Sequence, residues 1–196
     1  MPALHGDRKE TRLGPARRAA INEFLPAPGA AHMKKHLIAG AILSASLVLD
    51  IVTKYLVVSS MFEHQRINVL GSFVQLILLY NKGGLFGIMQ GYQSFFLSVS
   101  VLVLALMVAY YVLEKKKNLV FCSAMALIIS GALGNIIDRV SGRPGVVDFI
   151  YIGSDNVYRW PAFNVADAAI VVGAVMLLVF YYLEERRMKR EGTADQ

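Results

Sequence analysis

Four long runs of apolar residues divide the chain, and each is long enough to cross a membrane. The runs cover 37–58, 94–113, 119–137 and 162–183. A helix rises 1.5 Å per residue, so about 20 apolar residues span a hydrocarbon core of roughly 30 Å. The second and third runs contain no charged residue, whereas helices of a soluble bundle keep a polar face. The pattern therefore predicts an all-α membrane protein with four transmembrane helices rather than a soluble bundle.

A cleavable signal peptide is the alternative for the first run, because Lys34, Lys35 and His36 precede it. The run is longer than the apolar region of a typical signal peptide, and no small-x-small cleavage site with a polar mature chain follows it. We therefore expect a retained helix.

Basic residues set the expected orientation, because Lys and Arg concentrate in cytoplasmic loops. Clusters lie at 34–35, 115–117 and 186–190, which four spans place on one side. Both termini are therefore expected in the cytoplasm, with loops 59–93 and 138–161 outside. The 20 Lys and Arg against 14 Asp and Glu leave a charge of +6, which we attribute to topology and anionic lipid headgroups rather than nucleic acid.

Composition divides the chain into three parts. Residues 1–32 are polar and contain Pro and Arg, and we expect a disordered extension. Residues 33–185 form the predicted transmembrane domain, and 186–196 a charged tail. The segment 72–80 is apolar and β-prone, and a turn signal follows from Asn81. It predicts a small periplasmic β-element on the outer membrane surface, with an interfacial helix as the alternative.

Polar residues within the spans converge on the outer third of the bilayer. At 1.5 Å per residue, Asp50 lies roughly 20 Å from the inner edge. The spacing also puts Asp50 and Lys54 within pairing distance, and gives Asn164 and Asp167 a shared face. Polar groups inside a membrane are costly and are often functional, although they can also be interhelical clasps. The convergent set comprises Asp50, Lys54, Asn135, Asp138, Arg139, Asn164 and Asp167.

The chemistry available at this level is that of carboxylates. The single cysteine, Cys122, falls near the cytoplasmic end of its run, and the four histidines lie away from the convergent residues. We therefore expect neither a Ser–His or Cys–His nucleophile nor a metal site. Two neighbouring carboxylates can share a proton, so that one activates water while the other acts as an acid. The outer candidates are Asp138, Asp148, Asp155 and Asp167.

Two other functions remain open on these residues. A small proton-coupled transporter or channel could use Asp50, Asp138 and Asp167 as a relay, but the inner half of the spans is nearly free of the polar groups that it would need. In a non-catalytic membrane scaffold, the same aspartates would be clasps.

Five blocks resemble bacterial lipoprotein signal peptidase, the type II signal peptidase, in the order and at the topological positions of that family. The resemblance covers about 34–185. The blocks are DIVTK from Asp50, Tyr80-Asn81, GALGNIIDR ending at Arg139, VVDF containing Asp148, and PAFNVAD ending at Asp167.

The resemblance implies an aspartyl endopeptidase of the bacterial inner membrane, with its active site facing the periplasm. It would cleave prolipoproteins before a cysteine that carries a diacylglyceryl group, and the cyclic peptide globomycin would occupy its cleft. The implied catalytic pair is Asp148 and Asp167, and Asn164 would orient substrate or a carboxylate. The family also implies substrate contacts for Asn81 and Arg139, and supporting roles for Asp50, Lys54, Asn135 and Asp138.

One segment departs from the family pattern. After Tyr-Asn the family usually reads Thr-Gly-Ala-Ala-Phe-Ser, and this chain has KGGLFG from Lys82 to Gly87. The change alters the surface expected to face the substrate and leaves the carboxylates untouched. We expect no cofactor, a monomer, and partners limited to prolipoprotein substrates, membrane lipid and globomycin-like inhibitors.

Overall fold

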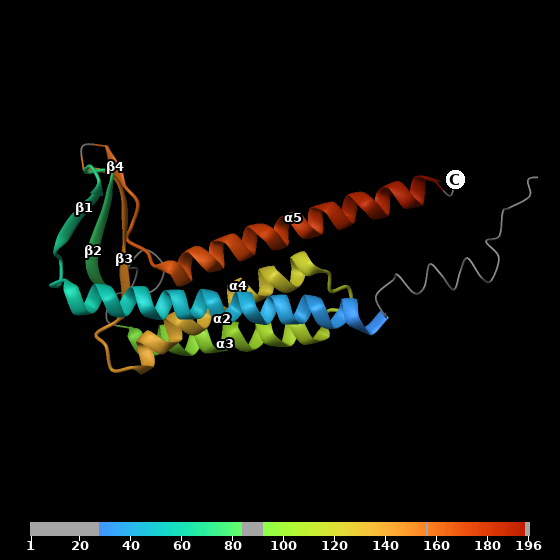
Figure 1. Ribbon diagram of the computed structural model, residues 1–196, viewed down its shortest axis with the longest axis horizontal. Helices are drawn as coiled ribbons and strands as arrows, with labels where there is room; N and C mark the ends of the chain where they lie inside the picture. Colours follow the sequence, from blue (N-terminus) through green and yellow to red (C-terminus); the bar gives the residue numbers. More distant parts are fainter. Residues whose placement is uncertain (1–27, 84–91, 156, 195–196) are drawn as a thin grey trace, which may run out of the picture. The chain divides into compact units, whose positions relative to one another are not determined.

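The computed structural model describes residues 28–83, 92–155 and 157–194, and it contains four long helices and a small sheet (Figure 1). The chain divides into two units, Met1–Lys34 and Lys35–Gln196, and the second holds the features below. All four helices are long and apolar enough to cross a membrane, which confirms the predicted fold class. They are α2 (Pro28–Ser60), α3 (Gln93–Leu113), α4 (Leu119–Val140) and α5 (Val165–Ala194).

Two helix ends differ from the sequence expectation. Helix α2 begins at Pro28, ahead of the boundary expected between 32 and 33, and proline is well suited to a first helical position. Helix α5 continues to Ala194, so the charged tail extends the helix. Lys and Glu are good helix formers, and Lys189 pairs with Glu185 one turn away at 2.5 Å. Residues 1–27 lie outside the described part, so the expected extension stays a prediction.

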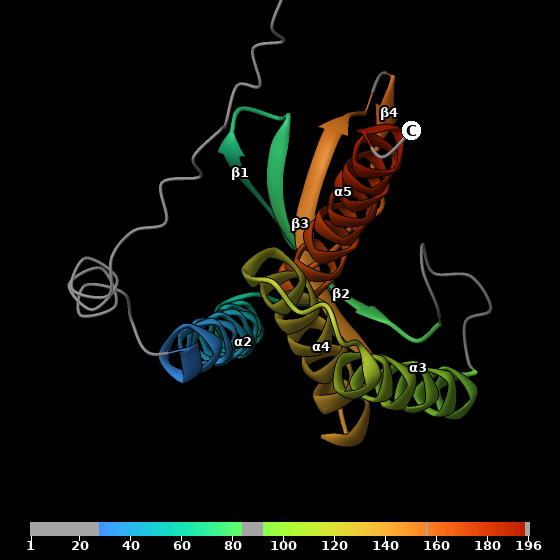
Figure 2. The ribbon, with the colours of Figure 1, turned by 90° about the vertical axis from the view of Figure 1, so that its right-hand side faces the viewer.

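Helix α4 packs against the other three helices, as Figure 2 shows. Its buried Phe121, Cys122 and Met125 form a core with Ala39 of α2 and Phe180 of α5. The close approach of α4 to α5 depends on small residues, because a Cβ at Gly131 would collide with the backbone oxygen of Ala166. Cys122 is therefore a packing residue, as expected.

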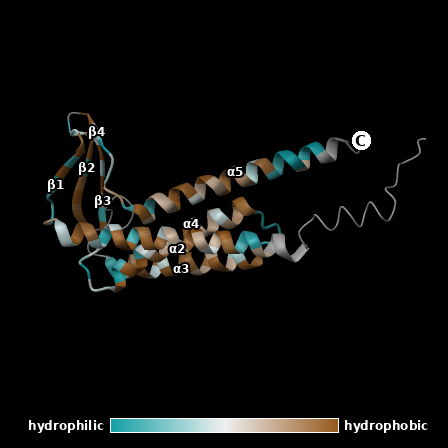
Figure 3. Cartoon of the chain, in the orientation of Figure 1, coloured by the Kyte–Doolittle hydropathy of each residue, from teal (hydrophilic) through white to brown (hydrophobic). Residues whose placement is uncertain are grey.

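Hydrophobic residues make up most of the length of the helices, apart from the hydrophilic C-terminal part of α5 (Figure 3). Helix α3 has no buried residue, and large side chains such as Leu102 and Leu106 are more than half exposed. An exposed apolar surface of this extent suits contact with lipid tails. The structure is thus that of a membrane-embedded bundle.

The four strands form an antiparallel sheet in the order β1-β2-β3-β4 at the end of the helices where α5 begins (Figure 1). Strand β2 confirms the predicted strand and excludes the interfacial helix. The sheet packs on the end of α2, where Val57 and Met61, the residue after the helix, form a core with Leu78, Val147 and Phe149. The strands are β1 (Arg66–Leu70), β2 (Val74–Asn81), β3 (Val146–Ser154) and β4 (Tyr158–Arg159).

Candidate active site

Asp148 projects from β3, opposite Leu79 of β2 in the strand register. Its carboxylate is 4 % exposed and accepts hydrogen bonds from Asn81 Nδ2 at 3.1 Å and Asn164 Nδ2 at 2.8 Å. Burial, followed by the charge of Asp167, raises the pKa of Asp148 to about 7, against the lowering effect of the two amides. Asp148 can therefore hold a proton near neutral pH.

Asp167 lies in the first turn of α5, where Asn164 caps the helix. Asn164 Oδ1 accepts a hydrogen bond from the backbone N–H of Asp167 at 2.8 Å, and Asp167 Oδ2 accepts one from the backbone N–H of Asn164 at 3.2 Å. This reciprocal pair is a capping box with aspartate in its third position. The other oxygen, Asp167 Oδ1, accepts a hydrogen bond from Asn135 Nδ2 at 2.8 Å. Both carboxylate oxygens are therefore held in defined directions.

A short antiparallel bridge brings the two aspartates together. Phe163 and Ile150 exchange backbone hydrogen bonds of 3.1 and 2.8 Å, which pins the segment before α5 against β3. Asn164, the next residue, thereby reaches Asp148 with its side chain while it caps the helix that carries Asp167. The connection between α4 and α5 thus folds back onto the start of α5, and Gly142, with φ of +78°, lies in its turn.

Three buried charges anchor the elements that carry the aspartates. Lys54 of α2 lies 2.8 Å from both Asp50 Oδ2 and Asp138 Oδ2. Asp50 Oδ1 accepts the backbone N–H of Ala166 in α5 at 2.8 Å, and Asp138 Oδ2 accepts that of Val147 in β3 at 3.2 Å. This cluster of Asp50, Lys54 and Asp138, here called the buried charge cluster, therefore links α2 to the start of both elements. The predicted Asp50–Lys54 pair is confirmed.

Asn135 connects the buried charge cluster to the aspartates. Its Oδ1 accepts hydrogen bonds from Lys54 Nζ at 3.1 Å and from Asn164 Nδ2 at 3.2 Å, and its amide nitrogen bonds Asp167. The structure thus brings Asn135 into the same network as Lys54, Asn164 and Asp167.

Arg143 was not expected in this network, and its guanidinium pairs with Asp138 Oδ1. It follows Asp138 by five residues, across the turn that ends α4. Helical spacing predicts partners at three or four residues, so the pair had no local sequence signal. The capping box was also missed, although Asn-x-x-Asp before an apolar run is a pattern that indicates one.

Arg139 and Asn81 lie beside the aspartates, and the substrate contacts expected of them stay a prediction. Arg139 donates from Nη1 to the oxygen of Asn135 at 3.2 Å and from Nη2 to the oxygen of Gly83 at 3.3 Å, and it interacts electrostatically with Asp167 and Asp148. Asn81 Oδ1 accepts the backbone N–H of Gly83 at 3.1 Å. In the unusual 82–87 segment, residues 84–87 lie outside the described part of the chain.

The histidines of the described residues lie away from the two aspartates. His36 Nδ1 is 2.6 Å from the hydroxyl of Tyr111, and His64 pairs at 3.8 Å with Glu63 on an exposed surface. Within residues 28–83, 92–155 and 157–194, no group of three His, Cys, Asp or Glu side chains is placed to hold a metal ion.

Comparison with known proteins gives concordant matches over most of the chain. The family model of signal peptidase (SPase) II matches residues 42–183. A lipoprotein signal peptidase of Halalkalibacterium halodurans is 41 % identical over 150 residues, which are 76 % of this chain and 94 % of that protein. One from Listeria monocytogenes serotype 4b is 37 % identical over 147 residues, 74 % of this chain and 93 % of that protein.

Solved structures agree with these matches. One, described as a bacterial membrane enzyme at 2.3 Å resolution, has a TM-score of 0.69 and 29 % identity over 76 % of this chain and 89 % of its own. A second, so described at 1.9 Å resolution, has a TM-score of 0.65 and 30 % identity over 74 % of this chain and 92 % of its own. The family match and the relatives above 30 % identity show that this chain belongs to the signal peptidase II family of aspartic-type membrane proteases.

Proposed function

We propose that this bacterial multi-pass membrane protein, which removes signal peptides from prolipoproteins as its family does, uses Asp148 and Asp167 as a catalytic pair. The supporting observation is the position of Asn164. Its side chain donates to Asp148 Oδ1 at 2.8 Å and accepts the backbone N–H of Asp167 at 2.8 Å. Its backbone N–H also donates to Asp167 Oδ2 at 3.2 Å, so one residue is hydrogen-bonded to both carboxyl groups.

The pair supplies an acid and a base without a covalent intermediate. The scissile carbonyl of the substrate lies between the carboxyl groups. The ionised carboxylate takes a proton from a water molecule, whose oxygen bonds to the carbonyl carbon, while the protonated carboxyl donates its proton to the carbonyl oxygen. In the resulting tetrahedral diol, the carboxyl group that took the water proton gives it to the amide nitrogen, and the C–N bond breaks. The other carboxylate takes a proton from a diol hydroxyl, which leaves a carboxylic acid and an amine and restores the pair with its one proton. Each carboxyl group gives and takes a proton during the reaction, so neither role belongs permanently to one residue.

Electrostatics support a pair that holds one proton. Burial and the charge of Asp167 raise the pKa of Asp148 to about 7, close to the pH at which a general acid and base work best. Arg139 lies beside both acids and is suited to contact the substrate backbone, as is Asn81 at the end of β2. The hydrogen bonds of Arg139 and Asn81 to Gly83 hold these side chains at the border of the site.

The proposed substrate is a prolipoprotein whose cysteine already carries a diacylglyceryl group, cleaved just before that cysteine. The signal helix would lie against the apolar helices, with the acyl chains in lipid. Asp148 follows the end of α4 in β3, and Asp167 lies in the first turn of α5, so the cut would occur at the periplasmic boundary of the inner membrane. Globomycin would compete for the same cleft.

The test is a gel-shift assay of purified protein on a diacylglyceryl-modified precursor. Asp148→Asn and Asp167→Asn are each expected to abolish cleavage, whereas Asp155→Asn is the matched control. Asp155 is exposed and pairs with Arg159 on the sheet at 2.6 Å. Full cleavage by either of the first two variants would end the assignment. Unmodified precursor and added globomycin test the lipid requirement and the inhibitor.

A further inference from the structure

A second polar site lies away from the aspartates, between the connection that joins the end of α3 to the start of α4 and the C-terminal part of α5. The connection between α3 and α4 and the last turns of α5 line an open cavity of about 420 Å³. Of its seven lining side chains, four are cationic and one is a carboxylate, which leaves a net charge of +3. The cavity is therefore suited to an anion.

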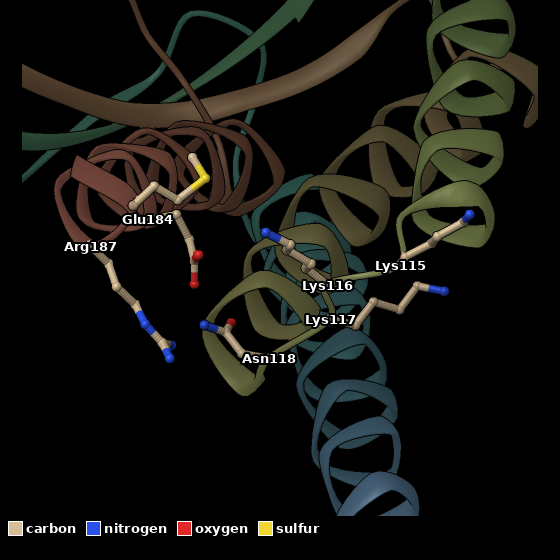
Figure 4. A pocket seen from close by; sticks show the side chains of 7 residues that line it. Lys115, Lys116, Lys117, Asn118, Glu184 and Arg187 are labelled. Carbon is tan, nitrogen blue, oxygen red and sulfur yellow. The ribbon is translucent and has the colours of Figure 1, made fainter. Parts of the chain in front are cut away.

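Figure 4 shows which of these groups face the cavity. Lys116 and Asn118 of the connection point towards α5, and Glu184 and Arg187 of α5 lie across from them. The head groups of Lys115 and Lys117 point away from α5. Lys116 and Arg187 are therefore the two cations best placed to bind a ligand.

The start of α4 adds a directed donor. Asn118 caps α4 by accepting the backbone N–H of Phe121 on its Oδ1 at 2.8 Å, so its amide nitrogen is left to point into the cavity (Figure 4). The N-terminus of a helix also carries a partial positive charge. A phosphate group between Lys116, Asn118 and Arg187 would meet two charges and a hydrogen-bond donor.

The surroundings favour a lipid as the carrier of the phosphate. Leu113 at the end of α3, Leu119 at the start of α4 and Leu183 in α5 are all exposed, and each is within two residues of a lining residue in sequence. Acyl chains would lie along these apolar surfaces while the headgroup enters the cavity. Basic pockets at the cytoplasmic ends of transmembrane helices bind acidic headgroups by this combination.

We propose that this cavity binds the phosphodiester headgroup of an anionic glycerophospholipid and thereby links the end of α5 to the connection between α3 and α4. The site is independent of the aspartates, which lie at the other end of the helices, so its test does not depend on proteolysis.

The experiment is native mass spectrometry of the full chain, released from detergent after titration with phosphatidylglycerol or phosphatidylcholine. The test variant is Lys116→Gln/Arg187→Gln. The matched control is Arg186→Gln/Lys189→Gln. It also removes two positive charges, both from α5, but changes no residue that lines the cavity. We expect the test variant to bind phosphatidylglycerol about thirtyfold more weakly, from two lost cations, and the control to bind as the unaltered protein does.

Three results would overturn the proposal. The first is equal binding of phosphatidylglycerol by the test and control variants. The second is binding of phosphatidylcholine by the unaltered protein that is as tight as its binding of phosphatidylglycerol. The third is displacement of the lipid by millimolar inorganic phosphate, which would identify a free anion as the ligand. If the double variant fails to fold, Lys116→Gln alone gives the same comparison, because its side chain is exposed in a connection. That single change should weaken lipid binding about fivefold.

Discussion

Lys54→Met tests whether the buried charge cluster holds the active site together. The ammonium group is 1 % exposed and lies 2.8 Å from a carboxylate oxygen of both Asp50 and Asp138. At that distance and an effective dielectric constant near 20, each pair attracts by about 6 kcal/mol before desolvation is subtracted. Methionine fills a similar volume but leaves two carboxylates without their shared cation.

The net cost should be about 3–5 kcal/mol, as for other buried pairs that lose one partner. For a chain of this size, 1 kcal/mol moves the melting temperature by about 2–4 °C, so a fall of about 10 °C is expected. The assay is thermal unfolding of the purified protein in detergent, together with cleavage of the lipidated precursor. Cleavage should fall as well, because Asp50 bonds the first turn of α5 and Asp138 bonds the start of β3.

Two further variants make the result specific. Lys115→Met, an exposed lysine, should shift the melting temperature by less than 2 °C. Lys54→Met/Asp50→Asn should recover part of the loss, because the second change removes the charge that lost its cation, whereas Asp138 keeps its pair with Arg143. A melting temperature that is unchanged in Lys54→Met would refute the reasoning, as would a double variant that is less stable than the single one.

Three more predictions concern the aspartates and the helix contact beneath them. The pKa of Asp148 is raised to about 7, so cleavage should fall as pH rises through 7, and a flat pH–rate profile would contradict this. Thermal stability should also fall from pH 5 to pH 8, because the folded protein holds a proton on Asp148 that the unfolded chain releases near pH 4. Asn81→Ala removes a hydrogen bond that lowers the pKa of Asp148, so the alkaline limb of the pH–rate profile should move to higher pH; a shift to lower pH would show that the amide acts in another way. Gly131→Ala places a methyl group against the backbone oxygen of Ala166 and 2.7 Å from Ile170 Cγ1, and it should lower the melting temperature by several degrees, whereas Gly40→Ala, which meets nothing within 4 Å, should not.

Local sequence patterns predict much of this architecture. The four spans follow from apolar runs of bilayer length, and the Asp50–Lys54 pair follows from a spacing of one helical turn. The strand at 74–81 follows from a β-prone segment before a turn signal. Such features depend on neighbours in sequence, so they can be predicted without knowledge of the fold.

The site itself depends on contacts between distant segments. Asn81 meets Asp148 across 67 residues, and Lys54 meets Asn135 across 81. The start of α5 at Val165 rather than 162 has the same origin, because Phe163 pairs with a strand and is thereby withdrawn from the helix. No periodicity in the sequence encodes that bridge.

The sequence by itself determined which polar residues share one level along the helices, since that level follows from the rise per residue. Which of them touch was decided by the tertiary structure. The turn after α4 brings Arg143 rather than a helical neighbour to Asp138, and the Ile150–Phe163 bridge sets Asn164 between the two aspartates. A buried carboxylate bonds the donors that tertiary packing brings close to it, and the position of those donors depends on the whole fold.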